Sequence, residues 1–353
     1  MRPILTLLLA VLLSSCGKSP PPETSRSTAM SGLAATQEAQ LAFTCAYEKD
    51  RIPPRDPEAE QLFQHARWLQ KRNLLKEDPA QYPVFERLYR IAAAHGHDKA
   101  AHNLALLLIR GQSDASDALS LPVQLAQDLI RRGIPQGYYD MGVLLNKGYG
   151  VVGDPRKSLT YLRKTADLGS PEAQYYVGDR LFMLGIDYAV PFRIGLQMKK
   201  CAAEQGHTEA AMEYAVHLQD EGKLEAATKY FQMAVKAGSD LAANKLRRSF
   251  LAPPTEDSLA YLGLAKDEER SRRYKILSDI LERYSYLNPT VDEIDQIVPL
   301  PPAQLPPWDG QIQWVKEWES GKAPPLPDAA RIAEMAKAKG LDPATGRPLQ
   351  AGS

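Results

Sequence analysis

The sequence has few cysteines, no excess of charge of either sign and no long hydrophobic run beyond its first residues. Only 3 of 353 residues are cysteine, and 43 lysines and arginines balance 43 aspartates and glutamates. A balanced chain has no net field to attract nucleic acid or anionic lipid, so no nucleic-acid partner is expected. After residue 16, no stretch of eighteen consecutive apolar residues predicts a transmembrane helix.

Motifs of common catalytic sites are also missing. The sequence contains no Gly-x-Ser-x-Gly, no phosphate-binding loop and no His-Glu-x-x-His. Its carboxylates are scattered without a distinctive pair. We therefore expect no catalytic residue, no cofactor and no enzyme activity.

The first residues resemble a bacterial lipoprotein signal. Arg2 precedes an apolar run from Ile4 to Leu13, which is too short to span a bilayer, and Leu13-Ser14-Ser15-Cys16 resembles a lipobox. The resemblance implies a signal peptide over residues 1–16, acylation of Cys16 and a periplasmic, lipid-anchored protein that contacts the membrane only through this anchor. Gly17, in place of Asp, fits the outer-membrane pattern. The alternative is an ordinary secretory signal with a chance cysteine.

Residues 17–37 are poor in apolar side chains and predict a flexible tether.

The middle of the chain repeats itself. Five glycines are spaced by 37, 36, 37 and 32 residues, namely Gly96, Gly133, Gly169, Gly206 and Gly238. Small residues stand four positions after each glycine, and larger apolar residues mostly stand eight and twelve positions after it. Those rows share one face of a helix, and apolar rows precede each glycine on another helix. Each unit is therefore predicted to be a helix hairpin whose glycine ends the first helix, and such hairpins must stack to bury both faces.

The third unit shows the connecting loop. Gly148-Tyr149-Gly150-Val151-Val152-Gly153 closes one helix, and Asp154-Pro155 supplies a helix N-cap and a first-turn proline. This loop, followed by Tyr161-Leu162-Arg163-Lys164-Thr165-Ala166-Asp167-Leu168-Gly169, resembles the Sel-like repeat, a relative of the tetratricopeptide repeat. The resemblance covers residues 85–251 and implies an all-α, α/α helical-hairpin solenoid with helical caps and a Pro/Trp-rich C-terminal segment.

Helical segments are predicted on both sides of the repeats. Residues 38–84 are expected to form an N-terminal helical cap with one helix near Glu38–Glu48 and another from Asp56-Pro57 to about Lys76. Residues 252–287 are expected to form two further helices after Glu256. The mixed-charge run from Lys266 to Arg273 is interpreted as a solvated face rather than a docking patch.

Residues 288–353 differ in composition from the rest. Eleven of the 27 prolines follow Leu287, and Trp308, Trp314 and Trp318 lie within eleven residues. One interpretation is that this proline-rich segment with tryptophans docks a partner along a groove. Packing of the tryptophans back on the array is favoured, because exposed tryptophans are costly.

Cysteine and histidine offer two further possibilities. A disulfide between Cys45 and Cys201 is allowed in the periplasm but disfavoured, because repeats contact only near neighbours; Cys201 is expected to be a small buried residue. His95, His97 and His102 cluster in sequence. A zinc site is disfavoured, because His97 and His207 share a repeat position that is usually exposed and no ligand completes the set.

Function is predicted from the repeats and from resemblance. Lipoproteins with similar repeats and tails act as immunity partners of phospholipase effectors delivered by type VI secretion, and the resemblance implies a toxin as protein partner. The alternatives are a general envelope scaffold or regulator and an unrecognised envelope hydrolase. Candidate partner-binding residues are Tyr138, Tyr139, Tyr175, Tyr176, Trp308 and Trp314. One tyrosine of each consecutive pair is expected to face outward; the alternative is that both members fill gaps between repeats.

Overall fold

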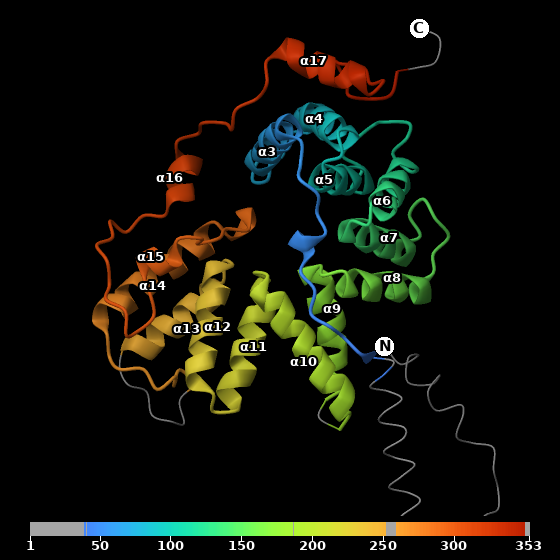
Figure 1. Ribbon diagram of the computed structural model, residues 1–353. Helices are drawn as coiled ribbons and strands as arrows, with labels where there is room; N and C mark the ends of the chain where they lie inside the picture. Colours follow the sequence, from blue (N-terminus) through green and yellow to red (C-terminus); the bar gives the residue numbers. More distant parts are fainter. Residues whose placement is uncertain (1–38, 40, 186, 252–258, 350–353) are drawn as a thin grey trace, which may run out of the picture.

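The chain folds into successive helix pairs that follow one another around a ring (Figure 1). The computed structural model describes residues 39, 41–185, 187–251 and 259–349. Within this part there is no β-strand, only an isolated bridge between Leu341 and Pro348, so the predicted all-α hairpin fold is confirmed. The α-helices are α3 Pro57–Arg72, α4 Tyr82–Ala94, α5 Asp98–Ile109, α6 Leu121–Arg131, α7 Pro135–Lys147, α8 Pro155–Asp167, α9 Pro171–Phe182, α10 Ala189–Glu204, α11 Thr208–Asp220, α12 Leu224–Lys236, α13 Asp240–Leu251, α14 Glu268–Arg283, α15 Ile294–Ile297, α16 Gln313–Glu319 and α17 Ala329–Ala338.

The repeat glycines lie in the tight turns between the two helices of each pair. All five have positive φ, between +72° at Gly133 and +108° at Gly238, a conformation that side chains with a Cβ rarely adopt. At the other end of the third unit, the Asp154 side chain accepts hydrogen bonds from the backbone of Arg156 and Lys157, and Pro155 begins α8. Both sequence signals for helix ends are confirmed.

The small residues of the repeat are buried where helices meet. Ala100, Ala173, Ala210 and Ala242 are all 0% exposed. Gly137 holds the same position, and a Cβ there would lie 2.5 Å from Cβ of Leu129. Close approach of the helices at this position therefore requires a small residue.

Two flanking helices predicted from the sequence are wrong over residues 42–47 and 259–267, although residues 39 and 41 are helical. Residues 42–47 are extended rather than helical, and residues 259–267 form turns and extended chain before α14. Gly263 in the second segment has φ +64°, which a helix does not tolerate. Leu259 in the same segment is 88% exposed.

The C-terminal segment closes the ring. After α14 it lies first on the last repeats and then returns to the beginning of the array, where α17 packs beside α3 and α4 (Figure 1). Ile332, Met335 and Ala336 of α17 belong to the core formed by α3, α4 and α5. The first and last parts of the solenoid are thereby joined.

Candidate partner-binding surfaces

The N-terminal segment lies across the middle of the array. Residues 42–55, here called the strap, pass over the tight turns of the repeats on their way to α3 (Figure 1). Cys45 forms a disulfide with Cys201 of α10, with Cα atoms 5.8 Å apart. The expectation of unpaired cysteines is wrong, because the strap brings Cys45 next to a repeat that lies 156 residues later in the sequence.

Side chains of the array hold the strap by its backbone. The amides of Gln174 and Gln205 donate to the carbonyl oxygen of Ala46, at 2.9 and 3.3 Å, and Gln205 also accepts from the backbone of Glu48 at 2.9 Å. Gly169 lets the strap approach, because a Cβ there would lie 2.6 Å from the Tyr47 carbonyl carbon. Side chains of the strap add to these contacts, because the Tyr47 hydroxyl donates to Glu204 at 3.2 Å and Arg55 donates to Asp98 at 2.6 Å.

Two arginines of the charged run hold the C-terminal segment in a similar way. Arg270 and Arg273 are 7% and 6% exposed, so the interpretation of this run as a solvated face is wrong for both. Arg270 donates to the carbonyl oxygens of Pro299 and Ala303, and Arg273 donates to that of Ile297. Because prolines supply no N–H, a proline-rich chain offers mainly carbonyl oxygens, which guanidinium groups bind well.

The tryptophans proposed for partner binding pack on the array. Trp308 and Trp314 are half-buried against the core of the last repeats. Their indole N–H groups donate to the carbonyl oxygens of Gln311 and Thr290, at 2.8 and 2.7 Å. Trp314 also meets the Tyr284 ring edge-on at 5.4 Å between centroids. The structure thus has the self-packed arrangement that the sequence favoured.

A ladder of polar side chains links successive repeats. The ladder pairs the residue six positions after one repeat glycine with the residue seven positions after the next repeat glycine. His102 Nδ1 lies 2.7 Å from Asp140 Oδ1, and the Tyr175 hydroxyl donates to Glu213 at 2.9 Å. Burial lowers the pKa of His102, but Asp140 raises it by more. Tyr139 holds the equivalent position in the repeat that lies between those of His102 and Tyr175. Burial raises the pKa of Tyr139, and nearby Glu172 adds to the shift.

The predicted tyrosines divide between this ladder and other contacts. Tyr175 belongs to the ladder and also stacks on His207 at 4.4 Å between ring centroids, whereas Tyr139 only holds the equivalent repeat position. Tyr138 lies 6.2 Å from the Tyr161 ring, and Arg180 lies 3.7 Å above the Tyr176 ring. All four are half-buried. No consecutive pair divides into one buried and one fully exposed tyrosine.

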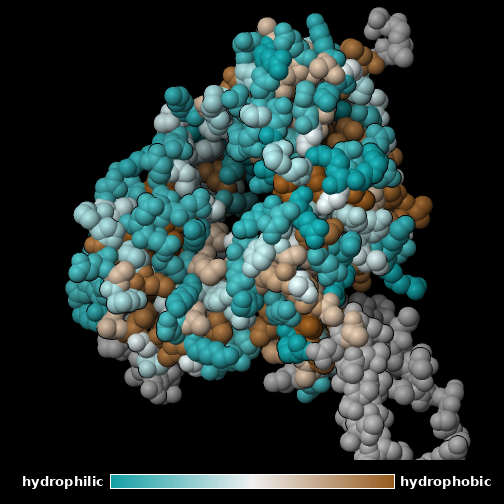
Figure 2. Space-filling model, in the orientation of Figure 1, coloured by the Kyte–Doolittle hydropathy of each residue, from teal (hydrophilic) through white to brown (hydrophobic). Residues whose placement is uncertain are grey.

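A hollow lies at the centre of the ring (Figure 2). Four adjoining cavities of about 350 to 650 Å³ surround it. The first cavity lies between α3 and α16, and its lining residues Lys71 and Trp314 also line a second cavity. Asp292 lines both the second cavity and a third. Gln205 lines both the third cavity and a fourth, which lies beside the strap. The fourth returns to α3. The hollow is therefore bounded by the strap, the C-terminal segment and the ends of repeat helices.

Charges of both signs line this hollow. Lys71, Lys229 and Arg55 face the cavities together with Glu48 and Glu204. Burial and nearby Arg67 lower the pKa of Lys71 to about 8, whereas burial, Glu172 and Asp98 raise the pKa of Glu48 to about 7. A broad, mixed-charge hollow suits a protein surface rather than a small apolar ligand.

The clustered histidines have structural contacts. His97 is 1% exposed, so the expectation of exposure is wrong. Its Nδ1 accepts from the backbone N–H of Ala100 at 3.1 Å, its Nε2 lies 2.9 Å from Glu60, and its ring stacks on Phe63. His207 caps α11 similarly. Among the residues that the structure describes, no group of three or more His, Cys, Asp or Glu is arranged to hold a metal ion.

The fold defines a Sel1-like repeat protein whose array is closed by its own terminal segments. Residues 242–349, from α13 through the C-terminal segment, match a family described as a domain of unknown function (DUF6396). None of the curated proteins matches the chain. In the described part of the chain, no helix combines the length and the apolar character needed to cross a membrane.

Solved structures from Pseudomonas aeruginosa are similar over most of their length. The immunity protein PA5088 is 30% identical, with 74% of this chain and 95% of that chain covered and a TM-score of 0.53. The immunity protein PA5087 is 28% identical and PA5086 is 29% identical, with the same coverage and TM-score. This chain belongs to the family of Sel1-like repeat proteins that includes the immunity protein PA5088.

Proposed function

We propose that this protein is an immunity protein that neutralises a toxin by binding it, and that the toxin is a phospholipase delivered by type VI secretion. The 30% identity to the immunity protein PA5088 over 95% of that chain carries the proposal. The broad polar surfaces of the ring support binding of a macromolecule, and two of the similar solved proteins, PA5087 and PA5088, are immunity proteins.

The proposed site of action is the periplasm, with the protein held at the outer membrane by acylated Cys16. Cys16 lies outside the described residues. The Cys45–Cys201 disulfide supports an oxidising compartment, because such bonds persist in the periplasm and are rare in the cytosol. Cys16→Ser should abolish labelling of the protein by a palmitate analogue in growing cells. Labelling that persists in this variant contradicts the anchor.

Competition between sibling strains tests the function. Cells lacking this protein should be killed by siblings that secrete its cognate phospholipase effector, to be sought first among the products of the neighbouring genes, and re-expression of the full chain should restore survival. Siblings whose phospholipase carries an inactivating substitution are the matched control and should not kill. Full survival of the deletion strain beside the active secretor would overturn the proposal. Co-purification of several partners in place of one toxin would indicate a general scaffold.

A further inference from the structure

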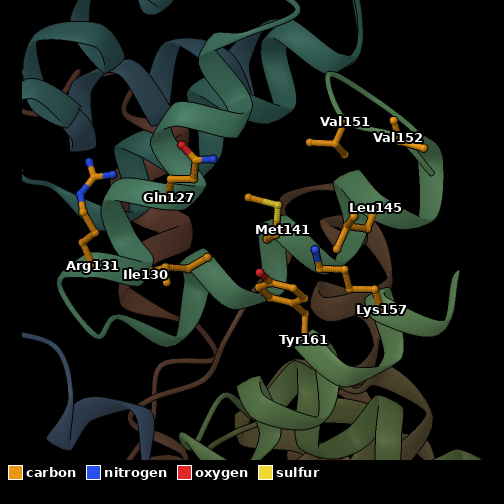
Figure 3. A pocket seen from close by; sticks show the side chains of 9 residues that line it. All are labelled: Gln127, Ile130, Arg131, Met141, Leu145, Val151, Val152, Lys157 and Tyr161. Atoms are coloured by element: carbon orange, nitrogen blue, oxygen red, sulfur yellow. The ribbon is translucent and has the colours of Figure 1, made fainter. Parts of the chain in front are cut away.

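A notch with apolar walls lies between α6, α7 and α8, outside the hollow already described (Figure 3). Its volume is about 470 Å³, and its apolar walls are Ile130, Met141, Leu145, Val151, Val152 and Tyr161. Val151 and Val152 belong to the loop between α7 and α8, which runs along the outer edge of the ring in Figure 1. The strap and the C-terminal segment line other cavities, so this surface remains open.

The loop that carries the two valines is fixed to the preceding helix pair. The Tyr149 hydroxyl is placed to donate to the carbonyl oxygens of Ala118 and Leu108, at 3.1 and 3.3 Å. Gly150 has φ +66°, and a Cβ there would lie 2.4 Å from the Leu119 carbonyl oxygen. A loop held in this way loses little conformational freedom when a partner binds, which favours affinity.

Val152 contributes apolar surface to this notch but is not buried in the hydrophobic core. Its side chain is 90% exposed, although valine is usually among the most buried residue types. An exposed apolar side chain at the edge of an apolar recess is typical of a site for a partner's anchoring residue.

The charged groups of the notch are both cations. Arg131 and Lys157 stand at its rim, and no carboxylate lines it. Arg131 forms an exposed ion pair with Asp128 on its own helix at 3.1 Å. Lys157 is exposed and forms no ion pair with the residues that the structure describes. The complementary occupant is therefore an apolar side chain with a carboxylate close to it.

We propose that this notch anchors the toxin by receiving an apolar side chain flanked by acidic residues from the toxin's surface. The inference rests on the proposed function, because it takes the partner to be that toxin. It adds which surface binds and which chemistry is recognised, and it places the anchor on the outer edge of the ring rather than in the hollow.

Two substitutions test the notch, each against a matched control. Val152→Asp places a carboxylate where the partner's own carboxylates would lie, and Leu259→Asp makes the same change at a leucine that is 88% exposed elsewhere. Lys157→Glu reverses the rim charge, and Lys157→Met removes it while keeping an apolar stem. Affinity for the purified phospholipase identified in the competition experiment is measured by calorimetry with the full-length protein, and folding is checked by thermal unfolding.

Val152→Asp and Lys157→Glu should each weaken binding at least tenfold, and Leu259→Asp should stay within twofold of the original protein. Lys157→Met should weaken binding less and should flatten its salt dependence. If the original protein and Val152→Asp bind the phospholipase with equal affinity, the proposal that the notch anchors the toxin is wrong, while the proposed function is unaffected. No binding by the original protein would overturn both. A dimer of this chain that Val152→Asp dissociates would identify a second copy as the occupant and contradict the inference.

Discussion

The repeat glycines do more than end helices. Gly169 and Gly238 lie where another part of the chain crosses a tight turn: the strap crosses at Gly169 and the segment after α14 crosses at Gly238. At Gly238 a Cβ would lie 2.1 Å from the carbonyl oxygen of Pro289, whereas at Gly206 no described atom lies within 4 Å of that position. Glycine is therefore required only by the turn at Gly206, whereas at Gly238 it is required both by the turn and by the chain segment that crosses it.

This difference predicts unequal effects of alanine at the two positions. Gly206→Ala should cost about 1 kcal/mol, because only its left-handed backbone is strained. Gly238→Ala should cost about 3 kcal/mol, because the new methyl group also displaces the segment at Pro289. Denaturant unfolding of the two variants measures the difference. Equal destabilisation would mean that the contact at Pro289 does not constrain the backbone.

Glu48 in the strap should make stability depend on pH. Its pKa is raised to about 7, mainly by burial, from an ordinary value of 4.5. The folded protein therefore binds this proton more tightly than the unfolded chain does, so the charged carboxylate costs stability above pH 7. The cost shrinks as the pH falls from 7 toward 4.5 and is gone below that range.

Glu48→Gln should accordingly raise the free energy of unfolding by about 1 to 2 kcal/mol at pH 8 and by nothing at pH 4.5. Asp50→Asn removes an exposed carboxylate two residues along the strap and serves as the control, with no expected change in stability. Thermal unfolding at both pH values checks this expectation. A gain from Glu48→Gln that is the same at both values would contradict it.

Residue-scale prediction from the sequence succeeded where a repeat position determines the contact. The glycine and alanine rows follow from spacing alone. The ladder between His102 and Asp140 was not predicted, although its two positions, six after one glycine and seven after the next, can be found in the same alignment. The roles of Arg270 and Arg273 were missed, because their partners are carbonyl oxygens of a distant segment. Every residue has a backbone carbonyl, so the sequence does not show which of them accept hydrogen bonds from distant side chains.

At the scale of elements, the strap depends on one covalent bond, on several backbone contacts and on the side chains of Tyr47 and Arg55. The sequence disfavoured the Cys45–Cys201 bond, because a solenoid contacts only near neighbours, and that rule holds for helices rather than for an extended segment crossing several repeats. Extended chain has no periodic apolar signal, so its course was not predictable from the sequence. The composition of the C-terminal segment did mark it as different, and its prolines explain why it crosses the array without regular helix.

Replacing both Cys45 and Cys201 with serine should lower the free energy of unfolding by about 2 to 4 kcal/mol, because the bond restricts a long loop of the unfolded chain. It should also speed hydrogen exchange of the backbone around Ala46 and Glu48. The double variant should not respond to reductant, whereas the original protein should lose stability when reduced. An original protein whose unfolding is unchanged by reductant would show that the bond does not hold the strap.

At the scale of the whole molecule, the ring is closed by contacts between its two ends. The Arg72 guanidinium of α3 lies 3.9 Å above the Trp318 ring of α16 and 5.1 Å from the Trp68 ring. Arg331 of α17 pairs with Glu58 of α3 at 2.7 Å. A plain solenoid has free ends, so closure gives the hollow a complete boundary.

Closure predicts coupling between Arg72 and Trp318. Arg72→Ala and Trp318→Ala should each cost about 1 to 2 kcal/mol, and the double variant should cost less than their sum because both remove the same contact. Arg72→Ala combined with Gly206→Ala, at separate sites, should instead be additive. A double-mutant cycle by denaturant unfolding measures both. Additive effects of Arg72→Ala and Trp318→Ala would contradict closure through this contact.

The central claim is that the protein acts by binding a toxin directly. Titration of the purified full-length protein into a phospholipase assay with the purified toxin tests this claim most directly. The account predicts that hydrolysis falls linearly with added protein and reaches a plateau at a fixed molar ratio, while a phospholipase from an unrelated source is unaffected. Undiminished hydrolysis in the presence of a large molar excess of this protein would contradict the account.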